Sequence, residues 1–369
     1  MQPELNTQTC KKCLLNKKYP KIVFDNEGVC SLCNEKREFK PFGEQKLVEL
    51  FDKYRNKHSE FDALVPLSGG KDSTYILHLA VNVYKLRVVA MTYDNGLLSE
   101  LAVENIKNAV AKTGVKHLFC KPDINLQKKI YKNMFLQTGD ICGACDIATK
   151  AHILKTARRY KVPMILYGSS PLEEDSFLPD SIQDIARFKY ILKKTKELSK
   201  NEIDKYLIYP NLNLFKLSIW KKTGVIGKEI RPLFYIKNPT DKEIAEIIKK
   251  EFNWKDKDNV EYSRHLDCIA EPFTNYVRNK IYGYERRICQ YSNMIRKGEI
   301  SKQKAEELYK KDNIDSLPDN YKEVLDFLDI SEKEMKQALN YKPLQYEKHI
   351  STVNRIFAKI IKVKKACSR

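Results

Sequence analysis

The stretch Leu64-Val65-Pro66-Leu67-Ser68-Gly69-Gly70-Lys71-Asp72-Ser73 is an apolar run that ends in a loop of small residues and continues as an amphipathic segment. This order predicts a strand, a tight loop and a helix that begins near Asp72. Ser68, Gly69 and Gly70 leave their backbone N–H groups accessible, so these groups can surround an anion at the start of the helix, where the helix dipole also favours negative charge. Lys71 adds a full positive charge there. The stretch therefore predicts a phosphate-binding loop.

The loop differs from the common P-loop, which has a glycine, four residues and then Gly-Lys-Ser/Thr. Here Val65 occupies the first glycine position and Asp72 follows the lysine. The sequence Ser-Gly-Gly-Lys-Asp-Ser instead resembles the loop of the PP-loop ATP pyrophosphatases, which cleave ATP between its α and β phosphates. An ordinary glycine-rich turn is the alternative, but it requires neither the lysine nor the flanking strand. The resemblance implies that ATP and Mg²⁺ bind at Ser68, Gly69, Gly70, Lys71, Asp72 and Ser73, with catalytic roles for the last three.

The rest of the first 250 residues alternates apolar strands with helical patterns, and such alternation is typical of an α/β protein. Strands are expected over 64–67, 87–93, 116–120 and 163–168, and helices over 41–60, 72–83, 101–112 and 143–160. Residues 171–235 lack a clear period. The fold class predicted is therefore α/β, a doubly wound parallel sheet.

Ligands of such sheets bind beyond the carboxyl ends of the strands. Two further loops there, an Asp-Asn-Gly turn and a Gly-Ser-Ser segment, strengthen the resemblance to the PP-loop family, which implies that Tyr93, Asp94, Gly168 and Ser169 hold adenosine. Arg231, in a Pro-Leu element that also occurs in the family, is expected to contact the phosphates; an ordinary surface arginine is the alternative. The acidic run Glu173, Glu174 and Asp175 is either a Mg²⁺ site or a solvated loop.

Ten cysteines in a chain without a secretory signal pattern favour metal ligation over disulfides. Two CxxC pairs separated by sixteen residues, Cys10 with Cys13 and Cys30 with Cys33, predict a four-cysteine zinc ribbon. A module of this size has too little core to fold without such a staple. A closed shell of four thiolates leaves no open position, so the ribbon is expected to be structural or a docking surface.

A third CxxC, Cys142 with Cys145, stands at the start of an expected helix. Its position is similar to a CxxC of the PP-loop tRNA thiolation enzymes, in which two cysteines and a distant third hold a 4Fe-4S cluster. Cys268 is the third ligand that this resemblance implies. A redox pair, a second zinc site and two packed core thiols are the alternatives.

Residues 265–286, together with the ribbon, the loop and Cys142/Cys145, resemble the N-acetyl sugar amidotransferases that make acetamidino groups on bacterial surface sugars. The resemblance reaches to about residue 300. It implies roles for Asp267, Cys268, Asn275, Tyr276 and Lys280, whereas His265 is expected to be structural.

The resemblance further implies that the enzyme adenylates an acetamido group of a sugar, such as a precursor of pseudaminic or legionaminic acid for lipopolysaccharide or flagellin glycans. Ammonia then displaces AMP. A separate glutaminase subunit is expected to supply the ammonia, because the chain has no glutaminase-like segment. The alternative is iron–sulfur-dependent tRNA thiolation by the same adenylation, and a third possibility is a zinc-ribbon adaptor that only binds nucleotide.

The composition is that of an ordinary soluble protein, and no apolar run is long enough to span a membrane. A cytoplasmic protein without a membrane partner is expected. The formal net charge of +19 admits tRNA as a partner, but the lysines are spread along the whole chain, and a solvated lysine-rich surface explains them as well. A homodimer is one hypothesis for the oligomeric state. The expected division is 1–40 zinc ribbon, 41–60 linker helix, 61–250 PP-loop domain and 251–369 helical C-terminal region for substrate and partner.

Overall fold

The computed structural model describes residues 8–35, 40–55, 59–169, 185–237, 239–257 and 267–340. Expected features at Ser170, at the acidic residues 173–175 and at His265 lie outside these ranges. No helix in the described part of the chain is both long and apolar enough to cross a bilayer.

A sheet of five parallel strands lies at the centre of the fold, in the order β3-β2-β1-β4-β5. The strands are β1 Ala63–Pro66, β2 Val88–Tyr93, β3 Lys116–Cys120, β4 Met164–Leu166 and β5 Lys228–Ile230. All residues of β2 and β4 are buried, as expected for strands covered on both faces. The expected fold class, an α/β parallel sheet, is confirmed.

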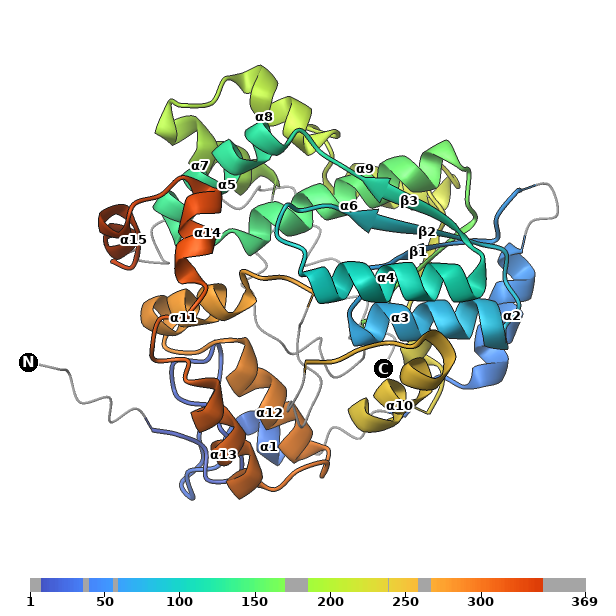
Figure 1. Cartoon of the computed structure of the whole chain (residues 1–369). Coiled ribbons are helices and arrows are strands. Elements are labelled where there is room, and N and C mark those ends of the chain that lie inside the picture. The colour runs from blue at the N-terminus through green and yellow to red at the C-terminus, as the bar shows by residue number, and fades with distance from the viewer. Residues whose placement is uncertain are drawn as a thin grey trace, which may run out of the picture.

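Helices cover both faces of this sheet (Figure 1). One apolar core contains α2 Glu44–Tyr54, α3 Lys71–His78, the π-helical turn Leu79–Val83, α4 Glu100–Thr113 and α10 Asp241–Phe252. The other contains α5 Ile124–Thr138, α6 Cys142–Arg159, α7 Ile185–Thr195 and α8 Lys200–Leu207. α9 Leu214–Lys222 and the 3-10 turn Pro232–Phe234 flank β5. The helix expected within 41–60 is observed over a shorter range as α2, and Leu47 and Phe51 of this helix are buried.

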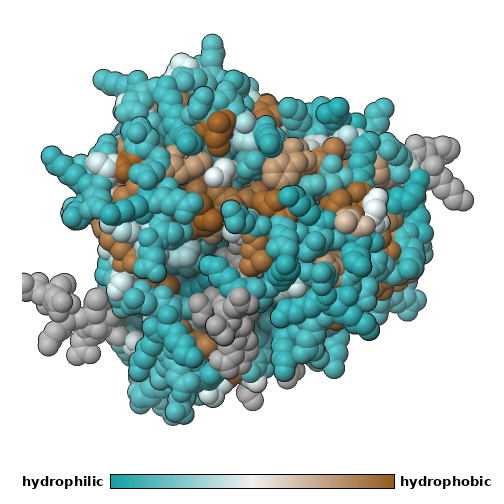
Figure 2. Space-filling model, in the orientation of Figure 1, coloured by the Kyte–Doolittle hydropathy of each residue, from teal (hydrophilic) through white to brown (hydrophobic). Residues whose placement is uncertain are grey.

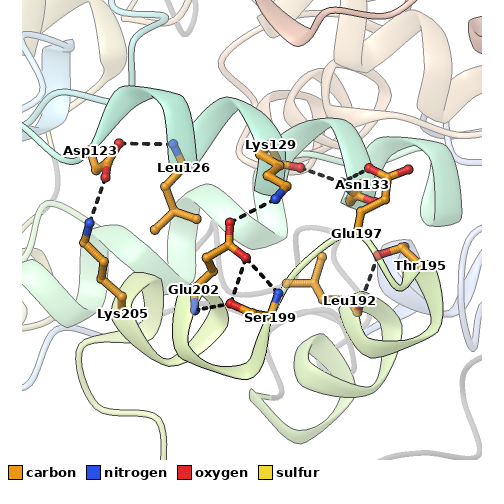
Figure 3. A network of polar contacts seen from close by, with 10 residues as sticks. All are labelled: Asp123, Leu126, Lys129, Asn133, Leu192, Thr195, Glu197, Ser199, Glu202 and Lys205. Atoms are coloured by element: carbon orange, nitrogen blue, oxygen red, sulfur yellow. Dashed lines mark hydrogen bonds and ion pairs between the residues drawn. The ribbon is translucent and has the colours of Figure 1, made fainter.

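Polar contacts join α5 to α8 and to the end of α7, the part of the chain whose sequence lacks a clear period (Figure 3). Lys129 forms an ion pair with Glu202 at 2.9 Å, and Lys205 forms one with Asp123 at 2.8 Å. Asn133 donates a hydrogen bond to Glu197 at 3.0 Å. α5 thus holds both helices of this pair through polar contacts.

The C-terminal region contributes α11 Glu271–Tyr282, α12 Arg286–Arg296, α13 Lys302–Asp312, α14 Tyr321–Leu328 and α15 Glu332–Ala338. α11, α14 and α15 join the core of α5, whereas α12 and α13 form a third apolar cluster with the N-terminal ribbon and its short helix α1 Ser31–Asn34. Figure 1 shows this ribbon, in blue, beside α12 and α13. Sequence segments far apart therefore share one core.

The face drawn in Figure 2 is mainly hydrophilic, with hydrophobic residues gathered in a band across its middle. Phe119 of β3 and Ile124 of α5 are among the large hydrophobic side chains that remain about two-fifths exposed.

Candidate functional site

The carboxyl ends of the parallel strands meet at one edge of the sheet, where ligands of such folds bind. The loops that follow the strands at this edge contain residues 67–70 after β1, 94–99 after β2, 167–169 after β4 and Arg231 after β5. The parallel sheet thus brings the expected phosphate loop and the other expected loops to the same edge.

The loop after β1 is closed by its two serines. The Ser73 hydroxyl lies 3.1 Å from the Ser68 hydroxyl and accepts a hydrogen bond from the Ser68 N–H at the same distance. The Gly70 N–H contacts the Ser68 hydroxyl at 3.3 Å, and the Gly70 carbonyl accepts from Ser73 and Thr74. These contacts fold the backbone back over the start of α3, where N–H groups and the helix dipole favour an anion.

Lys71 begins α3 and is almost fully buried, with 8% of its side chain exposed. Its ammonium lies 2.5 Å from a carboxylate oxygen of Asp72 and 2.9 Å from one of Asp241 at the start of α10. Burial lowers the pKa of Lys71, but the two carboxylates outweigh burial and leave the pKa above its ordinary value. The lysine therefore stays charged, which suits a residue that binds phosphate oxygens.

Two glycines allow the close approaches that this edge requires. Gly69 has a φ of +81°, and a β-carbon there would collide with the backbone carbonyl of Ala102. A β-carbon on Gly168 would lie 3.0 Å from the backbone of Asp72, so the end of β4 packs directly on the start of α3. Glycine is thus required at 69 for both its backbone conformation and its packing.

The variant Gly69→Ala is expected to lower the melting temperature more than Gly224→Ala does. Both glycines have a positive φ, +81° and +70°, so alanine costs about 1–2 kcal/mol at each. Only Gly69 adds a collision, because nothing lies within 4 Å of a β-carbon at Gly224. Thermal unfolding of the two variants measures the difference, and equal losses would contradict this account of the loop.

A segment of the C-terminal region reaches the same edge. Cys268 pairs with Leu98 in an antiparallel bridge, the Ile269 N–H donates to the Leu97 carbonyl at 2.8 Å, and the Ser99 N–H donates to the Asp267 carbonyl at 3.2 Å. The Asp267 carboxylate lies near Gly70, and burial raises its pKa while a hydrogen bond with Ser68 opposes the rise. Asp267, one of the residues to which the sequence resemblance assigned a role, therefore faces the phosphate loop.

The same pairing places Cys268 near Cys142 and Cys145, and the negative charge that these two thiols can carry adds to burial in raising the pKa of Cys268. The Asn95 amide donates to the Cys145 sulfur at 3.6 Å, and the hydroxyl of the fully buried Tyr131 has no hydrogen-bond partner among the described residues. The three expected cysteines therefore lie in the same part of the structure, but they are not among the groups of described residues whose ligand atoms lie close enough together to hold a metal ion.

The ribbon cysteines form a tighter cluster. The sulfurs of Cys10, Cys13, Cys30 and Cys33 all lie within 4.8 Å of one another. The Cys13 and Cys30 sulfurs are 3.7 Å apart, close to the spacing of about 3.8 Å that a tetrahedral zinc with bonds of about 2.3 Å requires. Hydrogen bonds with Cys30 and Cys33 lower the pKa of Cys13, and the same contacts raise the pKa of these two partners, so the cluster favours a thiolate at Cys13. These residues can bind a metal ion.

Other expected site residues have their own contacts. The Tyr93 hydroxyl donates to Gln127 at 2.6 Å inside the core, and the Asp94 carboxylate accepts from the Gly96 N–H. The Arg231 guanidinium lies over the Phe234 ring, with a centre-to-ring distance of 5.6 Å. The expected residues of α11 are arranged differently: Asn275 is fully buried and donates to Glu271 at 2.6 Å, and Lys280 lies over the ring of Tyr276.

Sequence reasoning missed three residues that contact the loop: Asp241, Trp254 and Asn105. Asp241 follows Thr240, which forms a capping box with Glu243. The capping box locates the start of α10 but does not reveal that Asp241 faces Lys71. No local pattern marks Trp254 or Asn105 as neighbours of Gly69, although both contact its carbonyl oxygen.

Residues 239–361 match the family model described as LPS biosynthesis protein WbpG-like, C-terminal domain. This part of the chain is thus similar to a domain of lipopolysaccharide biosynthesis proteins, in keeping with the resemblance found in the sequence. A further relative is the uncharacterized protein MJ1599 of Methanocaldococcus jannaschii, which is 21% identical over 226 residues, 59% of this chain and 76% of that protein.

Among solved structures, the chain is similar to a U34-tRNA thiolase, NcsA, from Methanococcus maripaludis, whose structure was solved with its 4Fe-4S cluster. The TM-score is 0.34 and the sequence identity is 14%, and the match covers 81% of this chain and 89% of that chain. An NMN synthetase from Francisella tularensis has a TM-score of 0.29 and 15% identity over 58% of this chain and 86% of its own. An NH3-dependent NAD synthetase from Campylobacter jejuni has a TM-score of 0.29 and 13% identity over 57% of this chain and 91% of its own.

Proposed function

We propose that this protein is an ATP-dependent amidotransferase that converts an acetamido group of a bacterial surface-glycan sugar into an acetamidino group. One observation carries the proposal: the region that matches the WbpG-like domain and the phosphate loop share a single site. Asp241 of that region contacts Lys71, and Asp267 lies beside Gly70. The region similar to a lipopolysaccharide biosynthesis domain therefore contributes side chains to the loop that is proposed to bind ATP.

The acetamido group needs activation, because its oxygen is a poor leaving group. In the proposed first step the amide oxygen attacks the α-phosphorus of ATP, the bond to the β-phosphate breaks, and pyrophosphate leaves. Ammonia then adds to the activated carbon, AMP departs with the former amide oxygen, and the proton lost from nitrogen passes to solvent. Lys71 and the N–H groups at the start of α3 would stabilise the negative charge of the departing pyrophosphate.

The residues that would bind each metal ion are assigned from the ligands that the ion prefers. Mg²⁺ would bind with ATP beside the carboxylates of Asp72 and Asp241 and would neutralise phosphate charge. Zn²⁺ would bind Cys10, Cys13, Cys30 and Cys33 in a structural role. A glutaminase subunit is the proposed source of ammonia. The sugar itself would lie beside Asp267, close to the loop.

The proposal is tested by incubating the protein with candidate acetamido sugars, ATP, Mg²⁺ and an ammonium salt. Mass spectrometry should find a sugar lighter by the difference between an oxygen atom and an NH group, and ammonium with the heavy nitrogen isotope should label it. The nucleotide products are expected to be AMP and pyrophosphate, because Asp72 replaces the Ser/Thr of the kinase-type loop. Sugar-dependent formation of ADP and phosphate would refute the assignment.

A second candidate function, tRNA thiolation, is favoured by Cys142, Cys145 and Cys268 at the same edge. Incubation with bulk tRNA and a sulfide source tests it, and thiolated tRNA without any sugar product would overturn the proposed amidotransferase. The extended distribution of lysine and arginine along the chain favours the sugar instead, since a tRNA enzyme usually gathers these residues on one face.

Protein purified without oxygen is expected to contain a 4Fe-4S cluster at Cys142, Cys145 and Cys268, because three thiols and the donor Asn95 favour such an anionic group. A brown protein, with iron and sulfide in equal amounts, is the expected result. Cys268→Ala should abolish the colour, whereas Cys120→Ala, at the end of β3, should preserve it. A colourless protein that takes up no iron on reconstitution would leave the three as zinc ligands or core thiols.

A further inference from the structure

The carbonyl oxygen of Gly69 is held by two side chains from outside the phosphate loop. The Trp254 indole N–H donates to it at 3.0 Å, and the Asn105 amide contacts it at 3.4 Å. Both side chains are buried, Trp254 with 3% and Asn105 with 2% exposed. In this setting a hydrogen bond is shielded from competing water, so it constrains the peptide strongly.

The two donors are themselves fixed. Asn105 accepts from the Lys255 N–H at 2.7 Å and donates to the Lys255 carbonyl at 2.8 Å, which joins α4 to the chain just after α10. Asn253, with a φ of +57°, ends α10 and turns the chain toward this contact. The indole is therefore presented to Gly69 by two helices on one side of the sheet.

A trans peptide points its carbonyl and its N–H in opposite directions. With the Gly69 carbonyl directed at Trp254, the Gly70 N–H must point to the other side, where it now contacts the Ser68 hydroxyl at 3.3 Å. This contact is long for a hydrogen bond, so a phosphate oxygen could replace it at little cost. The orientation of this one peptide decides whether the loop offers an N–H or a carbonyl to an anion.

We propose that Trp254 and Asn105 are positioning residues that fix the Gly69–Gly70 peptide so that the Gly70 N–H binds the pyrophosphate part of ATP. The inference rests on the proposed function in that the loop must bind pyrophosphate. It also gives the WbpG-like region a direct role at the nucleotide, because Trp254 belongs to that region.

The variant Trp254→Phe keeps an aromatic ring but removes the N–H. Calorimetry with inorganic pyrophosphate and Mg²⁺ is expected to show affinity weakened by about tenfold, the upper range for loss of one hydrogen bond. The rate of AMP formation should fall by a similar factor, while the KM for the sugar stays unchanged. If Trp254 only stabilised the fold, the rate of AMP formation and the KM for the sugar would change together.

A second measurement uses the native Trp254. The chain has two tryptophans, and the other, Trp220, lies against Arg158 at 4.8 Å, in α9. The variant Trp220→Phe leaves Trp254 as the single indole, and its emission should change when inorganic pyrophosphate and Mg²⁺ are added. The emission test does not depend on whether the Trp254→Phe variant folds.

The outcomes are distinguishable. If the unaltered protein binds neither ATP nor pyrophosphate, the proposed function fails. If it binds them, but Trp254→Phe has the same affinity or the emission of Trp220→Phe does not respond, the positioning role is overturned.

Discussion

Replacing Lys71 by methionine is expected to slow release of pyrophosphate by roughly several hundredfold, a common cost of removing one group that stabilises transition-state charge. Methionine keeps most of the buried volume, so the loss reports the ammonium rather than a cavity. The effect should be in kcat, because the charge on the departing pyrophosphate develops only in the transition state. Quenched-flow measurement of AMP and pyrophosphate checks it.

Two further variants distinguish the direct effect of the Lys71 ammonium from the effect of leaving its two carboxylate partners unpaired. Lys71→Met leaves Asp72 and Asp241 without the cation that both contact, and their repulsion could itself disturb the loop. The double variant with Asp241→Asn relieves that repulsion and is expected to remain slow. Lys242→Ala removes a neighbouring lysine that is 81% exposed and should leave the rate unchanged. Recovery of the rate in the double variant would contradict a direct role for Lys71.

Cys13→Ser is expected to abolish zinc binding and unfold the ribbon, because a structural zinc contributes about 10–16 kcal/mol of apparent binding free energy to such modules. The apolar residues of α12 and α13 pack on the ribbon, so hydrogen exchange should accelerate in these two helices as well. The amides of β1 and β2 should keep their protection, since these strands belong to the other cores.

The matched control is Cys289→Ala. Cys289 is 3% exposed and lies in the same apolar cluster as the ribbon, but it is not one of the four clustered cysteines. This variant should retain one zinc and a protected ribbon. Metal analysis and hydrogen exchange check both variants, and a folded Cys13→Ser protein with unchanged protection at residues 8–35 would overturn the structural role of the metal.

The sequence predicted those parts of the site whose signals are local. The strand, the small-residue loop and the helix are adjacent along the chain, so one short stretch sufficed to find Ser68 to Ser73. The strand 116–120 has the expected bounds. The position of the three loops at one edge followed from parallel strands alone.

The contacts that complete the loop could not be predicted in this way. Asp241 is 170 residues from Lys71, and Trp254 is 185 residues from Gly69. Only the packing of α10 on the same side of the sheet as α3 and α4 brings them together. Tyr93 illustrates a different limit: every residue of β2 is buried, and nothing in the sequence of this strand reveals that the Tyr93 hydroxyl donates to Gln127 of α5.

Some helices were missed for identifiable reasons. Leu126, Ile130 and Met134 repeat every four residues, a signal that could have identified α5. By contrast, α9 has no buried residue among those whose side chains are described, so no apolar face marks it. Packing rather than pattern determines such elements.

The ribbon emerges from the ribosome before all other described parts of the chain, whereas α12 and α13, which receive it, are synthesised only after the whole parallel sheet. Its Leu14 N–H donates to the Ser292 hydroxyl, a contact between residues 278 positions apart. A loop this long closes slowly, and the apolar side of the ribbon stays exposed until translation of α12 and α13 is complete. Early metal loading would give the nascent ribbon its own fold during this interval, so zinc limitation in the cell should reduce the yield of native protein more than it reduces the activity of molecules already assembled.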